Sequence, residues 1–267
     1  MATMAYENGG DGTVSVGRIF SRAFSFIIGR PGIALGSAVL FGALPSLLNQ
    51  ALTYATLADP ENLTQSAAVG YMGLQFFSLF ITLVFSALMQ AIITRGLVIE
   101  HEGGSPSLGR CMADGLRFAI PIVLLTILWW LAISLGMLLL IVPGVILACM
   151  WAVSIPALVE ERTGVIGAFG RSRELTKGHR WKVFGLLAVV IISLYLIMAV
   201  LAVIGISTAS EGALANDEGV AITVLIATAL SGFIFSLLWS TIQPSLFVEL
   251  RDAKEGGSAG DLQQVFS

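Results

Sequence analysis

Charged residues are scarce in this sequence. Only 12% of its 267 residues are Asp, Glu, Lys or Arg, whereas a soluble globular domain usually carries about a quarter. Hydrophobic residues make up 56% of the chain and form uninterrupted runs of about 20 residues, the length that a helix needs to cross about 30 Å of hydrocarbon. No polar stretch is long enough for a separate soluble domain. The sequence therefore predicts an all-α, polytopic membrane protein.

The residue types that build common active sites are also scarce. The two histidines, His101 and His179, both fall in predicted loops, so an intramembrane metalloprotease would lack its metal ligands. The two cysteines, Cys111 and Cys149, form neither a disulfide framework nor a metal-binding spacing. The chain also has no GxSxG, P-loop or GxGxxG motif. We therefore expect no enzyme activity, no cofactor, no metal and no nucleic-acid partner.

Ionisable side chains are missing from the middle of the apolar runs. An ion-coupled transporter usually keeps one there, because a charge inside the membrane is costly and is retained only for use. Two amides, Gln75 and Gln90, could instead form hydrogen bonds between helices. This packing role is favoured over a substrate path, which stays open. The main polar residues of the runs are Asn49, Gln50, Gln75, Gln90 and Gln243.

The apolar runs predict six membrane spans. The third and fourth share a 40-residue stretch without a charge, which is about 60 Å of helix. Pro143-Gly144 is the expected turn of this hairpin, and either two crossings or a re-entrant hairpin fits the pattern. Trp129-Trp130 would then lie near mid-membrane, where an interfacial aromatic belt does not place them. The predicted runs are Pro31–Tyr54, Ala68–Ile93, Ala119–Leu158 (spans three and four), Val183–Ile206 and Val220–Val248.

Basic residues occur on only one side of this layout. All fourteen lie in the N-terminal segment, the second loop, the fourth loop or the C-terminal tail, and the other three loops have none. The positive-inside rule therefore predicts that both termini are cytoplasmic. The N-terminus does not resemble a cleavable signal peptide. We expect a six-span membrane domain over residues 13–250, with disordered tails at 1–12 and 251–267.

Three short cytoplasmic helices are predicted ahead of the spans. Val14–Gly29 has apolar residues on one face and basic residues on the other, a pattern typical of a helix in the headgroup plane, and Arg30-Pro31 should end it. A second helix is expected to open at Ser105-Pro106. Gly164–Lys177 forms the third, with Gly178 as its C-cap.

This order suggests a threefold internal repeat. Each unit would consist of an amphipathic helix, two spans and an acidic exit, and the exits contain Glu100, Glu160 and Glu249. Three units of the same orientation predict a six-helix bundle with three amphipathic helices around it. The alternative is a chance periodicity, which arises easily in any six-span protein.

Val159–Phe184 is the most basic stretch and holds six of the fourteen Lys and Arg residues. Each basic residue near an anionic membrane surface is worth about 1 kcal/mol, and arginine can bind a phosphate with two hydrogen bonds. Two interpretations stay open: a binding site for lipid headgroups, or a positive signal that only determines topology. The candidate headgroup ligands are Arg171, Arg173, Lys177, Arg180 and Lys182.

The same region resembles a known group of bacterial membrane proteins. The pattern is similar to the glycerophosphoryl diester phosphodiesterase membrane domain and to the YciC-like family of uncharacterised proteins, which implies a bacterial inner membrane. Some relatives carry a fused soluble phosphodiesterase with a His-Arg-Gly motif. Here His179-Arg180 is followed by Trp181, so that activity is not carried over. The matching residues are Val142-Pro143-Gly144, Pro156-Ala157-Leu158-Val159-Glu160 and Ser172-Arg173-Glu174-Leu175-Thr176-Lys177-Gly178-His179-Arg180-Trp181.

These features favour a non-catalytic inner-membrane protein that organises lipids or a partner protein at the cytoplasmic leaflet. The alternative is a transporter or flippase-like carrier of a small or lipidic substrate. A polar cavity at mid-depth would favour the carrier, and a dry, packed bundle would favour the first function. The expected partners are membrane lipids, including anionic ones, and a membrane protein, while the oligomeric state is not determined by the sequence.

Overall fold

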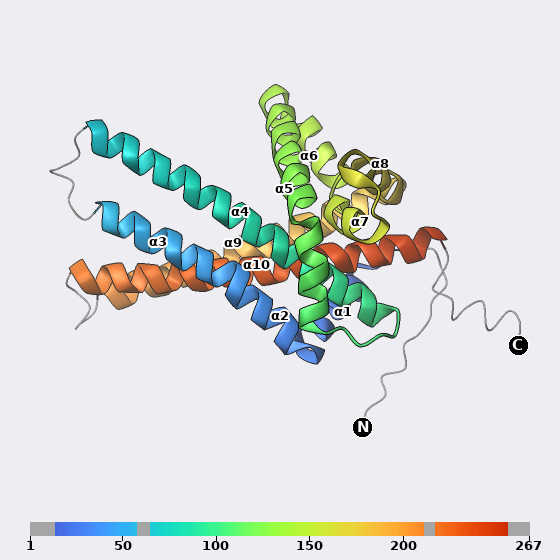
Figure 1. The fold of residues 1–267 in the computed structure, drawn as a ribbon, viewed down its shortest axis with the longest axis horizontal. Coiled ribbons are helices and arrows are strands. Elements are labelled where there is room, and N and C mark those ends of the chain that lie inside the picture. Colours follow the sequence, from blue (N-terminus) through green and yellow to red (C-terminus); the bar gives the residue numbers. More distant parts are fainter. Residues whose placement is uncertain (1–13, 58–64, 211–216, 256–267) are drawn as a thin grey trace, which may run out of the picture.

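The computed structural model describes residues 14–57, 65–210 and 217–255, and every regular element within them is a helix (Figure 1). The predicted all-α class is confirmed. In chain order the elements are α1 (Val16–Gly29), α2 (Pro31–Ala38), the π-helical η1 (Val39–Ala43), α3 (Leu44–Leu57), α4 (Gln65–His101), α5 (Leu108–Leu139), α6 (Ile141–Met150), α7 (Ser154–Glu161), α8 (Gly164–Thr176), α9 (Arg180–Ser210) and α10 (Asp217–Glu255).

Six helical segments are long and apolar enough to cross a membrane, and each overlaps a predicted span. The protein is therefore a polytopic helical membrane protein. Helices α4 and α10 run past the predicted ends of their spans, because their polar ends stay helical. The segments are Pro31–Gln50, Met72–His101, Leu108–Leu139, Ile141–Glu161, Arg180–Val200 and Ala229–Glu255.

The sequence predicts that the membrane domain ends at residue 250. Helix α10 continues to Glu255, and Arg251 and Asp252 form ion pairs with the end of α4. Residues 251–255 therefore belong to the helical domain. The predicted tail at 1–12 and residues 256–267 of the tail predicted at 251–267 lie outside the described residues.

Helix α1 ends before Pro31, as predicted, but its basic face does not point to water. Ile19 and Phe26 are buried in the core, and the side chain of Arg22 is only 12% exposed because it packs against α10. Phe24 and Ile28 are exposed instead. The helix therefore uses its arginines to attach to the protein and presents aromatic and aliphatic side chains outward.

The start of α5 and the turn after it differ from the predictions. No separate helix begins at Ser105-Pro106: α5 starts at Leu108 and continues through Pro121 as one helix. The chain then reverses at Leu140, which is extended (φ −161°, ψ 141°), and not at Pro143-Gly144. Pro143 lies in the first turn of α6, where a missing N–H is tolerated because the first N–H groups of a helix have no intrahelical acceptor.

Most long helices run lengthwise, whereas the α5–α6 hairpin runs across them. In Figure 1, α3, α4, α9 and α10 extend together toward one end, and the hairpin projects sideways. The larger core cluster combines side chains of α1, α2, α4, α9 and α10, and a smaller one joins α4, α5, α7 and α8. Helix α10 is the most buried of the candidate spans and lies at the centre of the packing.

Gly136 and Gly144 allow α5 and α6 to approach closely. A Cβ atom added at Gly144 would lie 2.9 Å from the backbone nitrogen of Met137, and one at Gly136 would lie 3.0 Å from Cα of Gly144. Real Cβ atoms essentially never lie closer than 3.0 Å to another atom, and a distance of 3.0 Å is tighter than most real Cβ contacts. The close packing of α5 against α6 therefore depends on glycine at both positions.

We expect Gly144→Ala to destabilise the protein by about 1–3 kcal/mol, because the overpacked hairpin must open. Gly73→Ala in α4 is the matched control, since nothing lies within 4 Å of its added Cβ, and alanine there should be neutral or stabilise by up to about 1 kcal/mol. Thermal unfolding of both variants in detergent measures the difference. Equal melting temperatures for the two variants would contradict the close approach.

Candidate functional site

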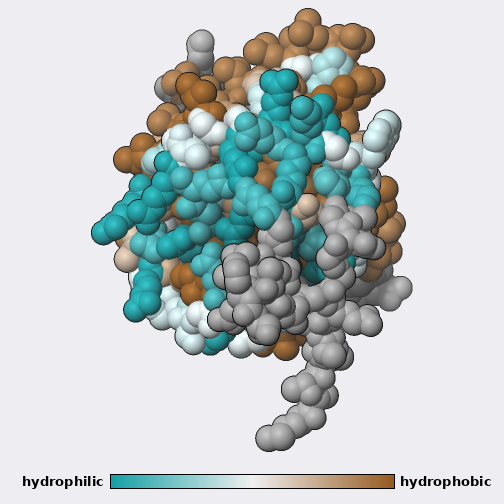
Figure 2. All heavy atoms as spheres, turned by 90° about the vertical axis from the view of Figure 1, so that its right-hand side faces the viewer, coloured by the Kyte–Doolittle hydropathy of each residue, from teal (hydrophilic) through white to brown (hydrophobic). Residues whose placement is uncertain are grey.

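The ion pairs of the described residues gather at one end of the molecule, where α1, α4, α7, α8 and α10 meet. Figure 2 views this end: hydrophilic residues fill its centre, and apolar residues surround them. This end, called the polar face below, contains both buried carboxylates and exposed cations. The buried carboxylates pair with arginines of neighbouring helices, whereas some of the exposed cations have no described carboxylate partner.

Glu249 of α10 holds α1 in place. Its side chain is only 4% exposed, and a buried carboxylate is costly unless it is paired. Nη2 of Arg18 lies 2.6 Å from Oε1 of Glu249, and Nη1 of Arg22 lies 3.6 Å from Oε2. The backbone N–H of Ser15 also donates to this carboxylate at 3.0 Å. The basic face of α1 is therefore used to neutralise a carboxylate of α10.

Arg95 of α4 joins both legs of the α5–α7 segment. Its Nη1 donates to Glu160 of α7 at 2.9 Å, and its Nη2 donates to Asp114 of α5 at 3.3 Å. The Glu160 side chain is 8% exposed. One guanidinium thus fixes the position of two other helices.

Arg30 pairs with Glu100 at 3.7 Å, so each acidic exit of the hypothesised repeat is paired with an arginine.

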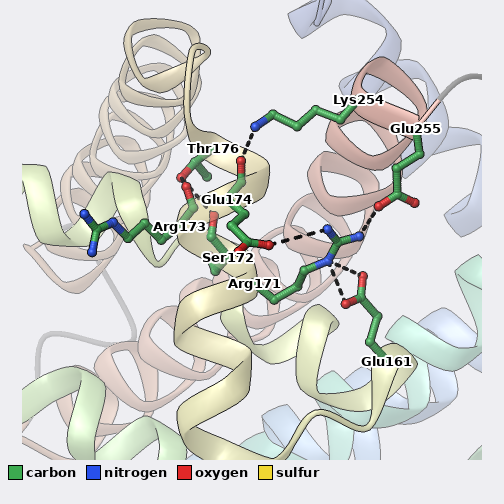
Figure 3. Close-up of polar contacts among 8 residues, drawn as sticks. All are labelled: Glu161, Arg171, Ser172, Arg173, Glu174, Thr176, Lys254 and Glu255. Carbon is green, nitrogen blue, oxygen red and sulfur yellow. Dashed lines mark hydrogen bonds and ion pairs between the residues drawn. The ribbon is translucent and has the colours of Figure 1, made fainter.

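Arg171, one of the five predicted headgroup ligands, is occupied by carboxylates of the protein itself (Figure 3). Its Nε lies 2.7 Å from Glu161 of α7, Glu174 lies 3.9 Å from its Nη1, and Glu255 of α10 forms a third ion pair. Burial lowers the pKa of Arg171, but the hydrogen bonds and charges of Glu255 and Glu161 outweigh this and raise the pKa above its ordinary value. Arg171 therefore links α7, α8 and α10.

The other four predicted ligands have no such partner. Within the described residues, no carboxylate lies within 4.0 Å of the charged nitrogens of Arg173, Lys177, Arg180 or Lys182. Figure 3 shows Arg173 pointing away from the carboxylates around Arg171. These four residues are called the basic corner below.

A turn between α8 and α9 brings the basic corner together. Helix α8 ends at Thr176 with Lys177 as its C-cap, and Gly178, the predicted C-cap, follows one residue later in a left-handed conformation (φ +92°). Helix α9 then begins at Arg180. The Nε of Arg180 and the Nδ1 of His179 are buried without a hydrogen-bond partner in the described part of the chain.

Two hydroxyls that the sequence analysis did not single out hold α8 in position. Ser172 and Thr176 donate to the carbonyl of Met150 at 3.0 and 3.2 Å, and Ser172 Oγ accepts the N–H of Val153 at 3.3 Å. Their spacing of four residues places them on one helix face, but no sequence pattern identifies Met150 as the acceptor. They attach α8 to the end of α6.

Aromatic side chains border the basic corner. Trp181 is 86% exposed, and its ring contacts Phe184 edge-on with centroids 6.2 Å apart. Tryptophan is enriched where a membrane meets water, because its ring is apolar and its N–H can donate a hydrogen bond. The combination of unpaired cations and exposed aromatic rings suits a surface at the level of lipid headgroups.

The comparisons with known proteins indicate a membrane protein and little more. A UPF0259 membrane protein of Pectobacterium carotovorum subsp. carotovorum (strain PC1) is 30% identical over 100 residues. The match covers 38% of this chain and 40% of the relative's length. No family model matches the chain, and no solved structure matches it.

We expect Arg95→Gln to lower stability by about 2–4 kcal/mol, because Glu160 would stay buried without a positive partner. Adding Glu160→Gln should recover part of the loss, since it removes the unpaired charge. Arg110→Gln is the control, because Arg110 is exposed and has no described carboxylate partner. Thermal unfolding in detergent tests this. If the double variant Arg95→Gln/Glu160→Gln were no more stable than Arg95→Gln alone, the result would contradict the ion pair between Arg95 and Glu160.

Arg171→Gln and Arg173→Gln form a matched pair in one helix. We expect Arg171→Gln to cost about 1 kcal/mol, because three carboxylates lose their partner at a partly exposed site. Arg173→Gln should stay within about 0.5 kcal/mol of the wild type, as is usual for an exposed surface position. Chemical unfolding measures both. Equal losses would contradict the assignment of Arg171 as a structural link.

Proposed function

We propose that this protein is a non-catalytic bacterial inner-membrane protein that binds anionic lipid headgroups at its basic corner. The observation that carries the proposal is the separation of paired from unpaired cations at the polar face. Six arginines have a carboxylate partner, and Lys254 donates to the carbonyl of Glu174. Seven cations have no described carboxylate partner: Arg110, Arg117, Arg162, Arg173, Lys177, Arg180 and Lys182. Four of the seven form the basic corner.

Electrostatics supports a headgroup as the ligand. About 1 kcal/mol for each cation near an anionic surface gives about 4 kcal/mol for the basic corner, which is about a thousandfold in a binding constant. The two arginines of the corner, Arg173 and Arg180, carry guanidinium groups, which can bind a phosphate with two hydrogen bonds. Trp181 and Phe184 would contact the acyl chains beneath the headgroup.

The orientation is part of the proposal. The fourteen basic residues lie outside the first, third and fifth predicted loops. By the positive-inside rule the polar face is cytoplasmic. The corner would then contact the inner leaflet, where anionic lipids give a negative surface potential.

Packing along α10 supports this function over that of a carrier. The buried hydroxyls of Ser240, Thr241 and Ser245 donate to carbonyl groups of their own helix. Hydroxyls used in this way have their hydrogen bond satisfied within their own helix and are not directed at a substrate. The resemblance to the glycerophosphoryl diester phosphodiesterase membrane domain fits a phosphodiester headgroup as ligand, without catalysis.

Native mass spectrometry tests the proposal with two variants of equal charge change. The site variant carries Arg173→Gln, Lys177→Gln and Lys182→Gln, which are all exposed positions. The control carries Arg110→Gln, Arg117→Gln and Arg162→Asn. Asparagine is used because residue 162 has a left-handed backbone (φ 53°), which asparagine tolerates.

We expect the wild type and the control to retain phosphatidylglycerol in preference to phosphatidylethanolamine. The site variant should bind phosphatidylglycerol at least about tenfold more weakly, because three favourable charges are lost. If the site variant retained as much phosphatidylglycerol as the wild type, the basic corner would serve only as a topology signal. An equal loss in both variants would show that only net charge matters.

A further inference from the structure

The reversal between α5 and α6 exposes only apolar side chains. Leu138 is 83% exposed, and its four neighbours through Val142 are exposed as well. No charged residue occurs between Ala119 and Leu158. A span that emerges into water normally ends in polar or interfacial residues, because exposed apolar surface is unfavourable there. The tip of the hairpin, residues 138–142, is therefore more stable in hydrocarbon than in water.

The hairpin does not reach the end of the molecule that lies opposite the polar face. In Figure 1, α3, α4, α9 and α10 extend to that far end, whereas the tip of the hairpin lies beside their middle. Helix α6 packs against α5, α8 and α9, so it stays near the polar face. Figure 2 shows the apolar surface extending upward past the hydrophilic centre of this face. If α4 and α10 cross the membrane, the hairpin lies sideways within it.

Trp129 and Trp130 fit this orientation. If α5 crossed the membrane, the two tryptophans would lie halfway along it, at the centre of the membrane, where tryptophan is not favoured. In a hairpin lying sideways, their position halfway along α5 does not by itself place them at the centre of the membrane. Trp130 is exposed and its ring meets that of Trp129 edge-on.

Two backbone positions at the reversal leave no unpaired N–H group. The N–H of Leu140 donates to the carbonyl of Gly136 at 3.0 Å, and Pro143 has no N–H. Unsatisfied backbone groups are what usually keeps irregular segments out of hydrocarbon. The base of the hairpin is fixed by Arg95, which pairs with Asp114 on one leg and Glu160 on the other.

We infer that the α5–α6 hairpin is a re-entrant element that enters and leaves the leaflet on the side of the polar face, with its tip among the acyl chains. Four helical spans then cross the membrane: α2 through α3, α4, α9 and α10. Both legs of the hairpin return to the same side, so the orientation of the rest of the chain is unchanged. The hairpin widens the protein within one leaflet only, and its partner surface is lipid hydrocarbon.

Spin-label depth measurement in phosphatidylglycerol–phosphatidylethanolamine vesicles tests this inference. The full chain carries Cys111→Ala and Cys149→Ala, and single cysteines replace Leu140 at the tip, Arg110 at the polar face, or Val69 at the far end of α4. All three positions are exposed, so the label need not disturb packing. Relaxation of the spin label by oxygen shows that the label lies in hydrocarbon. Relaxation by a water-soluble nickel complex shows that it lies at the aqueous interface.

We expect the label at position 140 to be the most accessible to oxygen and the least accessible to nickel of the three. A label at position 140 that is as accessible to nickel as the label at position 69 would mean that the hairpin crosses the membrane, and would overturn the inference. Helical circular dichroism equal to that of the wild type controls for folding. The result is independent of lipid binding at the basic corner.

Discussion

The pairing of Arg95 with Glu160 is the constraint on which the arrangement of helices depends. Glu160 lies beneath the polar face, and an unpaired carboxylate at that depth would be strongly unfavourable. Because the same guanidinium also reaches Asp114, α4 is linked both to the first part of α5 and to the end of α7. The sideways course of the hairpin follows from this fixed base and from the close approach of Gly136 to Gly144.

Ion pairs between charged residues of different helices recur at the polar face. Glu249 is neutralised by two arginines of α1, and Arg171 is neutralised by carboxylates of α7, α8 and α10. The amphipathic segments are thereby attached to the helices of the membrane domain. The four cations of the basic corner have no described carboxylate partner, and they lie together around one turn between α8 and α9.

Lipid is the environment that makes the exposed surface of this protein reasonable. Large apolar side chains are exposed along α3, α4, α5 and α9, whereas the buried core is concentrated toward the polar face, around Leu246 and Phe247 of α10. In water such a surface would drive aggregation. In hydrocarbon it has no such cost, and the structure needs specific pairing only where its helices meet water.

Local physical signals determined much of the fold. Long apolar runs predicted the candidate spans, Arg30-Pro31 predicted a helix break, and Gly178 predicted a helix end. The turn at Leu140 could not be predicted in this way. Proline and glycine usually mark turns, but the first turn of a helix also accepts proline.

The candidate site was only partly predictable. Its basic residues were visible in the sequence, but the difference between Arg171 and Arg173 was not. The two lie two residues apart on one helix, and no local pattern distinguishes them. Their roles differ because Glu161 and Glu255 come within reach of Arg171 alone, and Glu255 is 84 positions away in the chain. The sequence by itself determined where the positive charge lies, and only the tertiary structure decided which cations stay unpaired, because their partners come from distant helices.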